Sequence, residues 1–129
     1  MRRRTAIYAA LFALIPPLCA QAAPPEANVR NAMRNAPLPV ARQYLQEARS
    51  LAAERCYLEA VTPLLITAEA LAYFQAQEIG RINSLGATAG NVRQQILNYA
   101  TAIETNNDYA VSTIDGWLDQ IDRWSTRPH

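Results

Sequence analysis

The chain has 129 residues, of which 50% are hydrophobic, with 12 basic residues, 11 acidic residues and a formal net charge of +1. This length suits a single domain, and the near-neutral charge argues against the basic surface of a nucleic-acid-binding protein. The hydrophobic fraction is too high for a disordered chain, and two cysteines are too few for a disulfide-rich scaffold.

The first 22 residues have the pattern of a secretory signal peptide. Three arginines at 2–4 precede an uncharged apolar run at 6–15, and Ala20-Gln21-Ala22 has the small residues of a cleavage site. We expect residues 1–22 to be removed after Ala22, with export to the bacterial periplasm or secretion and no membrane attachment afterwards. The apolar run is shorter than the roughly 20 residues of a membrane span. An uncleaved anchor is the alternative that the pattern leaves open.

Removal of residues 1–22 would change the charge and the cysteine content. The remaining 107 residues carry 9 arginines and 11 acidic residues, a net charge of −2, and their one cysteine is Cys56. We therefore expect a free thiol at Cys56, at the junction of two predicted helices. The alternatives are a partly buried small residue, an intermolecular disulfide, and a redox or acylated site.

Apolar residues in the rest of the chain recur at helical spacing, and no segment has the sustained alternation of a strand. Residues 23–38 predict an N-terminal arm or a short helix. Four longer amphipathic helices and a flexible tail follow, at 39–55, 57–79, 91–105, 108–124 and 125–129 respectively. The prediction is an all-α fold, in which residues 39–124 form an up-down bundle of about four helices, built as two stacked helical hairpins.

Two segments allow more than one structural interpretation. Pro63 either kinks a continuous helix over 57–79 or starts a new helix with Thr62 as its N-cap, and apolar residues in phase on both sides favour the kink. Residues 80–90 contain three of the four glycines. They predict either a loop or a continuous helix of small residues that packs closely against a neighbour.

The helix over 57–79 has two apolar edges. Its predicted inward stripe includes Leu64 and Leu65, whereas Ile66, Tyr73 and Phe74 lie off that stripe. This second edge either packs against a third helix or binds a partner. Ile66, Tyr73 and Phe74 are therefore candidate partner-binding residues.

An acidic row lies on the outward face of the last predicted helix. Asp115, Asp119 and Asp122 follow i, i+4, i+7 spacing. A solvated face is the favoured interpretation, with a patch for a basic partner or a cation site as alternatives. Arg42 and Arg49 lie on the predicted outward face of 39–55, so opposite charges could associate two copies head to tail or pack together within one chain.

The sequence offers no centre for catalysis. Its single histidine is His129, the last residue, and it has no Cys-x-x-Cys pair and no phosphate-binding glycine loop. Catalysis or metal binding by histidine therefore has no plausible site. We expect a protein that is not an enzyme and that has no catalytic, cofactor-binding or metal-binding residues.

Residues from about 36 to 70 resemble a single tetratricopeptide-type helical hairpin. The matching residues are Ala48-x-x-Leu51-Ala52 and Tyr57-x-x-Ala60-x-x-x-Leu64-x-x-x-Ala68-Glu69. With Ala36-Pro37-Leu38, Ala41-Arg42 and Arg49, the same segment is similar to the YfdX family of small periplasmic helical proteins. This resemblance implies a helical fold, an association with bacterial stress responses and no enzymatic site.

These observations predict an exported, non-enzymatic helical interaction module, such as an adaptor, a stress-linked chaperone-like protein or an inhibitor. Its partner would be another protein or a second copy, with no nucleic acid involved. One alternative is a carrier that holds a small apolar ligand inside the bundle. The other is a structural homodimer linked through Cys56.

Overall fold

The computed structural model describes residues 27–81 and 84–126. Within these residues the chain forms five helices and no strand. They are α2 (Ala27–Asn35), α3 (Pro37–Ala53), α4 (Tyr57–Glu78), α5 (Leu85–Ala100) and α6 (Ala110–Thr126). The prediction of an all-helical bundle is confirmed, and the count is five because residues 27–35 also form a helix. The predicted signal peptide and cleavage site lie outside the described residues.

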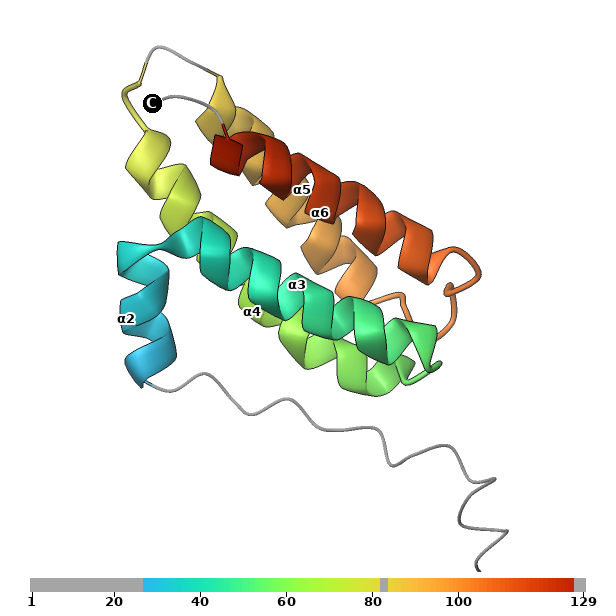
Figure 1. Cartoon of the computed structure of the whole chain (residues 1–129). Coiled ribbons are helices and arrows are strands. Elements are labelled where there is room, and N and C mark those ends of the chain that lie inside the picture. The colour runs from blue at the N-terminus through green and yellow to red at the C-terminus, as the bar shows by residue number, and fades with distance from the viewer. Residues whose placement is uncertain (1–26, 82–83, 127–129) are drawn as a thin grey trace, which may run out of the picture.

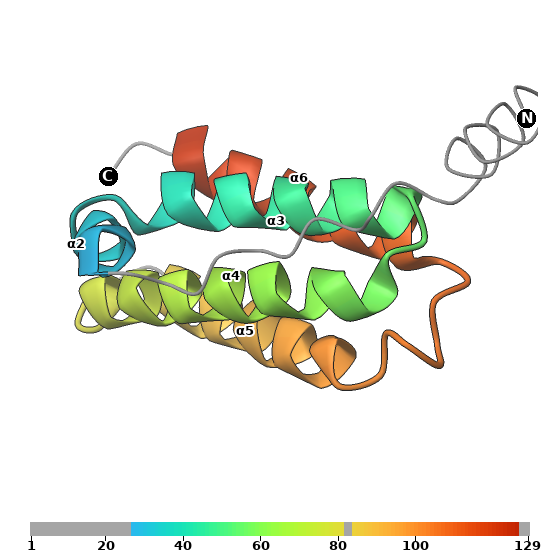
Figure 2. The ribbon, with the colours of Figure 1, turned by 90° about the horizontal axis from the view of Figure 1, so that it is seen from below.

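The four long helices form two layers. Helices α3 and α6 lie side by side in one layer and α4 and α5 in the other, while α2 crosses one end of the bundle (Figures 1 and 2). The backbones of α3 and α4, α4 and α5, and α3 and α6 pack closely. Helices α5 and α6 meet instead through long side chains, since Tyr99 contacts Trp117 edge-on at 5.7 Å and Trp117 Nε1 donates to Gln95 Oε1 at 3.1 Å.

Helix α2 is anchored to the bundle by one buried side chain and to α4 by two polar contacts. Met33 is fully buried in the core. Arg30 Nε lies 3.3 Å from Glu69 Oε2, and Gln77 Nε2 donates to the carbonyl oxygen of Arg34 at 2.7 Å. Residues 27–35 are therefore a docked helix rather than an arm.

Prolines mark the start of α3 and the interior of α4. Helix α3 begins at Pro37, two residues before the predicted start, and proline suits this position because the first turn has no internal use for its N–H. Helix α4 continues through Pro63, so the alternative of a new helix capped by Thr62 is wrong. The buried Thr67 hydroxyl donates to the carbonyl oxygen of Pro63 at 2.8 Å.

The segment between α4 and α5 is not helical throughout, so the continuous-helix alternative for 80–90 is wrong. Ile79 leaves the helical conformation with a ψ of 132°, and Gly80 follows with a φ of 88°, which suits a residue without a Cβ. Helix α5 then begins at Leu85, six residues before the predicted start. The close packing expected of small residues does occur, because a Cβ at Gly86 would lie 3.3 Å from the Cβ of Glu78.

The later helix ends also differ from the predictions. Helix α5 ends at Ala100, five residues early, and α6 begins at Ala110, two residues late. Helix α6 includes residues 125–126, which were expected in the tail, and residues 127–129 lie outside the described part. No helix in the described residues is long and apolar enough to cross a membrane.

The core runs between the two layers and is filled by aliphatic and small side chains. Leu64, Leu71, Ile96, Ile114 and Ile121 are each fully buried. Buried alanines from α3, α4 and α5 lie among them, which lets the helix backbones approach closely. Phe74 stacks on Trp124 at the end of the core near α2, with 6.0 Å between the two ring centroids.

The turn from α3 to α4 places a large residue in a conformation that favours glycine. Arg55 has a φ of 63°, directly after the end of α3. The N–H of Arg55 donates to Ala52 at 3.0 Å and the N–H of Cys56 donates to Leu51 at 2.8 Å. This is the Schellman pattern of helix termination, whose left-handed residue is usually glycine.

Arg55→Gly is therefore expected to stabilise the fold. The left-handed conformation costs a non-glycine residue about 1–2 kcal/mol, and part of the gain is lost because glycine is more flexible in the unfolded chain. We expect a net increase in unfolding free energy of about 0.5–1 kcal/mol, measured by urea denaturation. Arg55→Ala is the control, because it removes the guanidinium but keeps the strained backbone. A glycine variant no more stable than the alanine variant would contradict the prediction.

Candidate functional site

Two of the predicted partner-binding residues lie in the core. Ile66 is 2% exposed and Phe74 is 4% exposed and stacks on Trp124. The second apolar edge of α4 is thus covered within the chain, and the prediction that Ile66 and Phe74 bind a partner is wrong. Tyr73 differs, because it is only partly buried and its side chain reaches the surface.

The acidic row of α6 is paired with arginines. Asp115 forms a two-pronged pair with Arg49 of α3, and Arg42 Nε lies 2.6 Å from Asp122 Oδ1. Asp119 pairs with Arg123 of its own helix at 2.6 Å. The hydrogen bond to Asp115 and the attraction of its charge raise the pKa of Arg49 above its ordinary value.

These ion pairs distinguish between the two expectations for the opposite charges of α3 and α6, which were association of two copies and packing within one chain. Arg42 and Arg49 face α6 rather than pointing away from the bundle, so the charges pack together within one chain. The charges of the three aspartates are partly neutralised by these arginines. Asp115 and Asp122 contribute to the contact between α3 and α6, whereas Asp119 pairs on the surface of α6. No group of three or more residues suited to holding a metal ion occurs in the described part of the chain.

Cys56 lies at the N-cap of α4 and is 2% exposed. In this structure of the whole chain it is disulfide-bonded, so it does not match the expectation of a free thiol. That expectation concerned a shortened chain without Cys19, which lies outside the described residues. For that form it stays a prediction.

The outer side of α4 carries a row of exposed apolar residues. Leu58 is 61% exposed, Leu65 is 45% exposed, and Ala72 is partly exposed at the same seven-residue spacing. Ile79 continues the spacing just after the helix and is 76% exposed. We call Leu58, Leu65, Ala72 and Ile79 the outer α4 row. Residues seven apart stay on one helix face, so Leu58, Leu65 and Ala72 share one side of α4, with Thr62 and Glu69 between them and Ile79 just beyond the helix.

A shallow hollow lies in the C-terminal half of the outer α4 row. It has a volume of about 350 Å³ and is lined by Glu69, Ala72, Tyr73 and Ala76. These positions are i, i+3, i+4 and i+7, the four residues that form the hole for a knob in helix–helix packing. We call it the α4 hollow. Its single charge, Glu69, is already paired with Arg30 of α2.

Sequence reasoning missed the outer α4 row because α4 is apolar on almost every side. Its inward stripe was assigned to include Leu65, but Leu65 is exposed and its neighbours Leu64 and Ile66 are buried. The one signal that could have found the row is its seven-residue repeat, which differs from the 3.6-residue period of the buried stripe.

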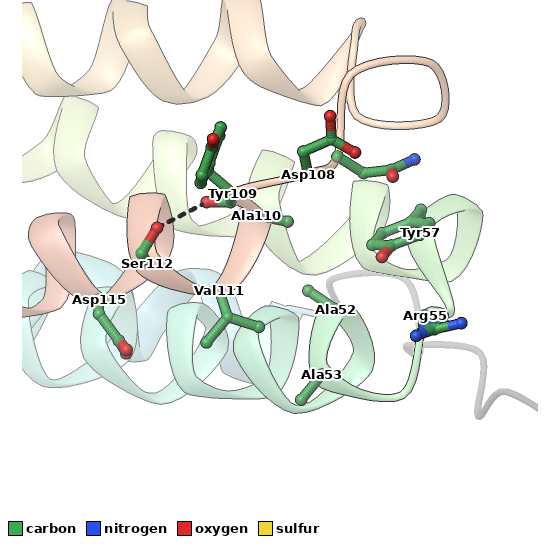
Figure 3. A pocket seen from close by; sticks show the side chains of 11 residues that line it. Ala52, Ala53, Arg55, Tyr57, Asp108, Tyr109, Ala110, Val111, Ser112 and Asp115 are labelled. Atoms are coloured by element: carbon green, nitrogen blue, oxygen red, sulfur yellow. Dashed lines mark hydrogen bonds between the residues drawn. The ribbon is translucent and has the colours of Figure 1, made fainter.

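The α3–α4 turn lies at the end of the bundle opposite α2 (Figure 1), and a second hollow lies beside this turn (Figure 3). It has a volume of about 460 Å³ and is lined by residues from the end of α3, the α3–α4 turn, the α5–α6 connection and the start of α6. Tyr57, Arg55 and Asp108 lie on one side and Asp115 on the other (Figure 3). Asp115 is held by Arg49, so this hollow presents a mixture of charges and no arrangement of reacting groups.

Tyr99 lies beside a third hollow, between α5 and α6, with Trp117. Burial raises the pKa of the Tyr99 phenol above its ordinary value, and the nearby Tyr57 and Asp108 add to the shift. Because the folded state favours the neutral phenol, the stabilisation is complete below the unfolded pKa of about 10 and is lost as the pH rises through the folded pKa.

We therefore expect Tyr99 to ionise later than a free tyrosine when the pH is raised. The measurement is an absorbance titration of tyrosinate in the folded protein and in Tyr99→Phe. The difference between the two curves should show a transition above pH 10, with the folded protein losing stability over the same range. A difference curve centred at or below pH 10 would contradict this assignment.

Comparison of the chain with models of known protein families, with curated proteins and with solved structures finds no match.

Proposed function

We propose that this protein is an exported, non-enzymatic interaction module, and that its outer α4 row binds an amphipathic helix of a partner. The observation that carries the proposal is the exposure of Leu58 and Leu65, two turns apart on one helix. A large exposed apolar residue on its own is ordinary. A row of them, beside a hollow lined by two alanines, a tyrosine and a glutamate, is typical of a docking surface.

The spacing of the row favours a helix as the bound element. Leu58, Leu65 and Ala72 repeat every seven residues, or about 10.5 Å along the helix axis. A partner helix that crosses α4 at a small angle would meet the outer α4 row with its own apolar stripe. An extended strand would need unpaired backbone groups beside it, and among the described residues there is no strand to supply them.

The position of α4 also supports the proposal. Its other sides pack against α2, α3 and α5, so the outer row stands on a helix that is held rigidly from behind. A rigid surface loses little conformational entropy on binding. The bundle of α3, α4, α5 and α6, with α2 across its end, would then be the scaffold that presents the outer α4 row.

The proposal is tested by photo-crosslinking in cells that express the full chain. A photoreactive amino acid replaces Leu65 in one strain and Tyr109 in another. Tyr109 is the matched control because it is also a large exposed residue, at 77%, but lies outside α4. We expect a discrete crosslinked product from position 65, none from position 109, and loss of the product when Leu58→Glu is added.

Each other result counts against the proposal. Products of equal amount from both positions would mean non-specific contact, and no product from position 65 would mean that the row has no partner. A product that survives Leu58→Glu would show binding that does not use the outer α4 row.

A further inference from the structure

We propose that the helix bound by the outer α4 row is α4 of a second copy of this chain, lying antiparallel to the first. This inference rests on the proposed function and identifies the partner at the same surface. Helix α4 carries both a projecting side chain and a matching hollow, at a spacing that two antiparallel copies satisfy at once.

Leu65 is the projection. It stands 45% exposed on the outer row, at about the middle of the helix. The α4 hollow, formed by Glu69, Ala72, Tyr73 and Ala76, is centred about two turns further along the same helix. When two such helices pair antiparallel about a two-fold axis between Leu65 and Ala72, each Leu65 enters the partner copy's hollow.

The same register also pairs the ends of the row. Leu58 lies seven residues before Leu65, and Ile79 lies seven residues after Ala72, so these two exposed residues come opposite each other. A parallel pair would place Leu65 against Leu65 and hollow against hollow. That arrangement crowds one half of the interface and leaves the other half unfilled, which loses contact energy.

Charge favours the same orientation. Glu59 lies in the first turn of α4 and Arg81 lies three residues after its end, where it is about half exposed while pairing with Glu78 at 2.7 Å. Antiparallel copies bring Glu59 of one chain near Arg81 of the other. Parallel copies would bring Glu59 near its equivalent, where like charges repel. Glu69 lies near its equivalent in either orientation, so it does not distinguish them.

The first test measures the mass of the purified full chain by sedimentation at a series of concentrations. We expect a dimer that dissociates on dilution. Leu65→Ala removes the projection, Ala72→Leu fills the hollow, and each should raise the dimer dissociation constant by about 100-fold, because each change acts twice in a symmetric interface. Tyr109→Ala is the control and should leave the constant unchanged.

The second test fixes the orientation by disulfide formation between copies. Thr62 and Ala76 flank the row and lie opposite each other only in the antiparallel register. Thr62→Cys with Ala76→Cys should therefore give a linked dimer under mild oxidation, above the level of the unsubstituted chain. Thr62→Cys alone should not, because its equivalent in the other copy would be too far away.

The outcomes separate this inference from the proposed function. A protein that sediments as a monomer at every concentration overturns the antiparallel dimer, and so does linkage by Thr62→Cys alone. A dimer unaffected by Leu65→Ala and Ala72→Leu overturns it as well. A crosslink in cells from position 65 to a different protein would leave the proposed function standing and this inference refuted, whereas a crosslinked product with twice the chain mass supports both.

Discussion

Replacing Trp124 by alanine is expected to lower the free energy of unfolding by about 3–5 kcal/mol. Trp124 is 5% exposed and stacks on Phe74, so its indole joins the last turns of α6 to α4. Removing it takes away a large buried aromatic surface and leaves a cavity that backbone movement fills only in part. Single domains are stable by about 5–15 kcal/mol, so such a loss would bring this chain close to unfolding.

The measurement is urea denaturation followed by far-ultraviolet circular dichroism. Trp124→Phe is the matched control, because it keeps a ring beside Phe74 and should lose clearly less stability than the alanine variant. Ser125→Ala, at an exposed position on the same turn, should change stability little. An alanine variant that loses less than about 1 kcal/mol would show that the Phe74–Trp124 contact does not hold α6 in place.

The second large effect contrasts two neighbouring leucines of α4. Leu64 is fully buried and Leu65 is 45% exposed, although the sequence pattern assigned both to the inward stripe. Leu64→Ala should cost about 2–5 kcal/mol of stability through the lost burial and the cavity it leaves. Leu65→Ala should cost less than about 1 kcal/mol in the monomer, because its methyl groups are already in contact with water.

The pair is measured by the same denaturation experiment, at concentrations low enough for the protein to be monomeric. Because the two residues have the same side chain and adjacent positions, helix propensity cancels and the difference reports burial alone. Equal losses for the two variants would mean that α4 is rotated relative to the orientation described, and the outer α4 row would then not exist.

The fold was predictable where apolar spacing was the only requirement. The helices α3, α4, α5 and α6 each follow from a stripe of apolar residues, since burying such a stripe is the main driving force for helix packing. Their ends were less predictable, because they depend on single residues. Helix α4 ends where Ile79 adopts an extended backbone, followed by the positive φ of Gly80, and α5 can begin at Leu85 because small residues fit against α4.

The main difference between the predicted and the observed structure is which face of α4 is buried, and this difference has a physical reason. On a helix that is apolar on nearly all sides, periodicity does not say which face is buried. Contacts from α3, α5 and α2 decide it, and they turn Ile66 and Phe74 inward and Leu65 outward. Of the three residues predicted on the second apolar edge, Ile66 and Phe74 are therefore buried and Tyr73 is partly exposed, whereas Leu65 of the predicted inward stripe is exposed.

The pairing of charges between α3 and α6 could not be found from local sequence. Arg42 and Asp122 are 80 residues apart, and Arg49 and Asp115 are 66 apart. Both pairs depend on the order in which the helices are arranged in space. The sequence leaves association between chains and packing within one chain as alternatives, and only the layer of α3 and α6 distinguishes them.

That layer joins the first long helix of the bundle to the last. The side of α3 that faces α6 has no cover until residues 110–126 are present, so a nascent or truncated chain exposes it together with Arg42 and Arg49. The bundle is therefore stable only when its final helix is present. A copy that lacks α6 would expose the apolar side of α3 to proteases and chaperones.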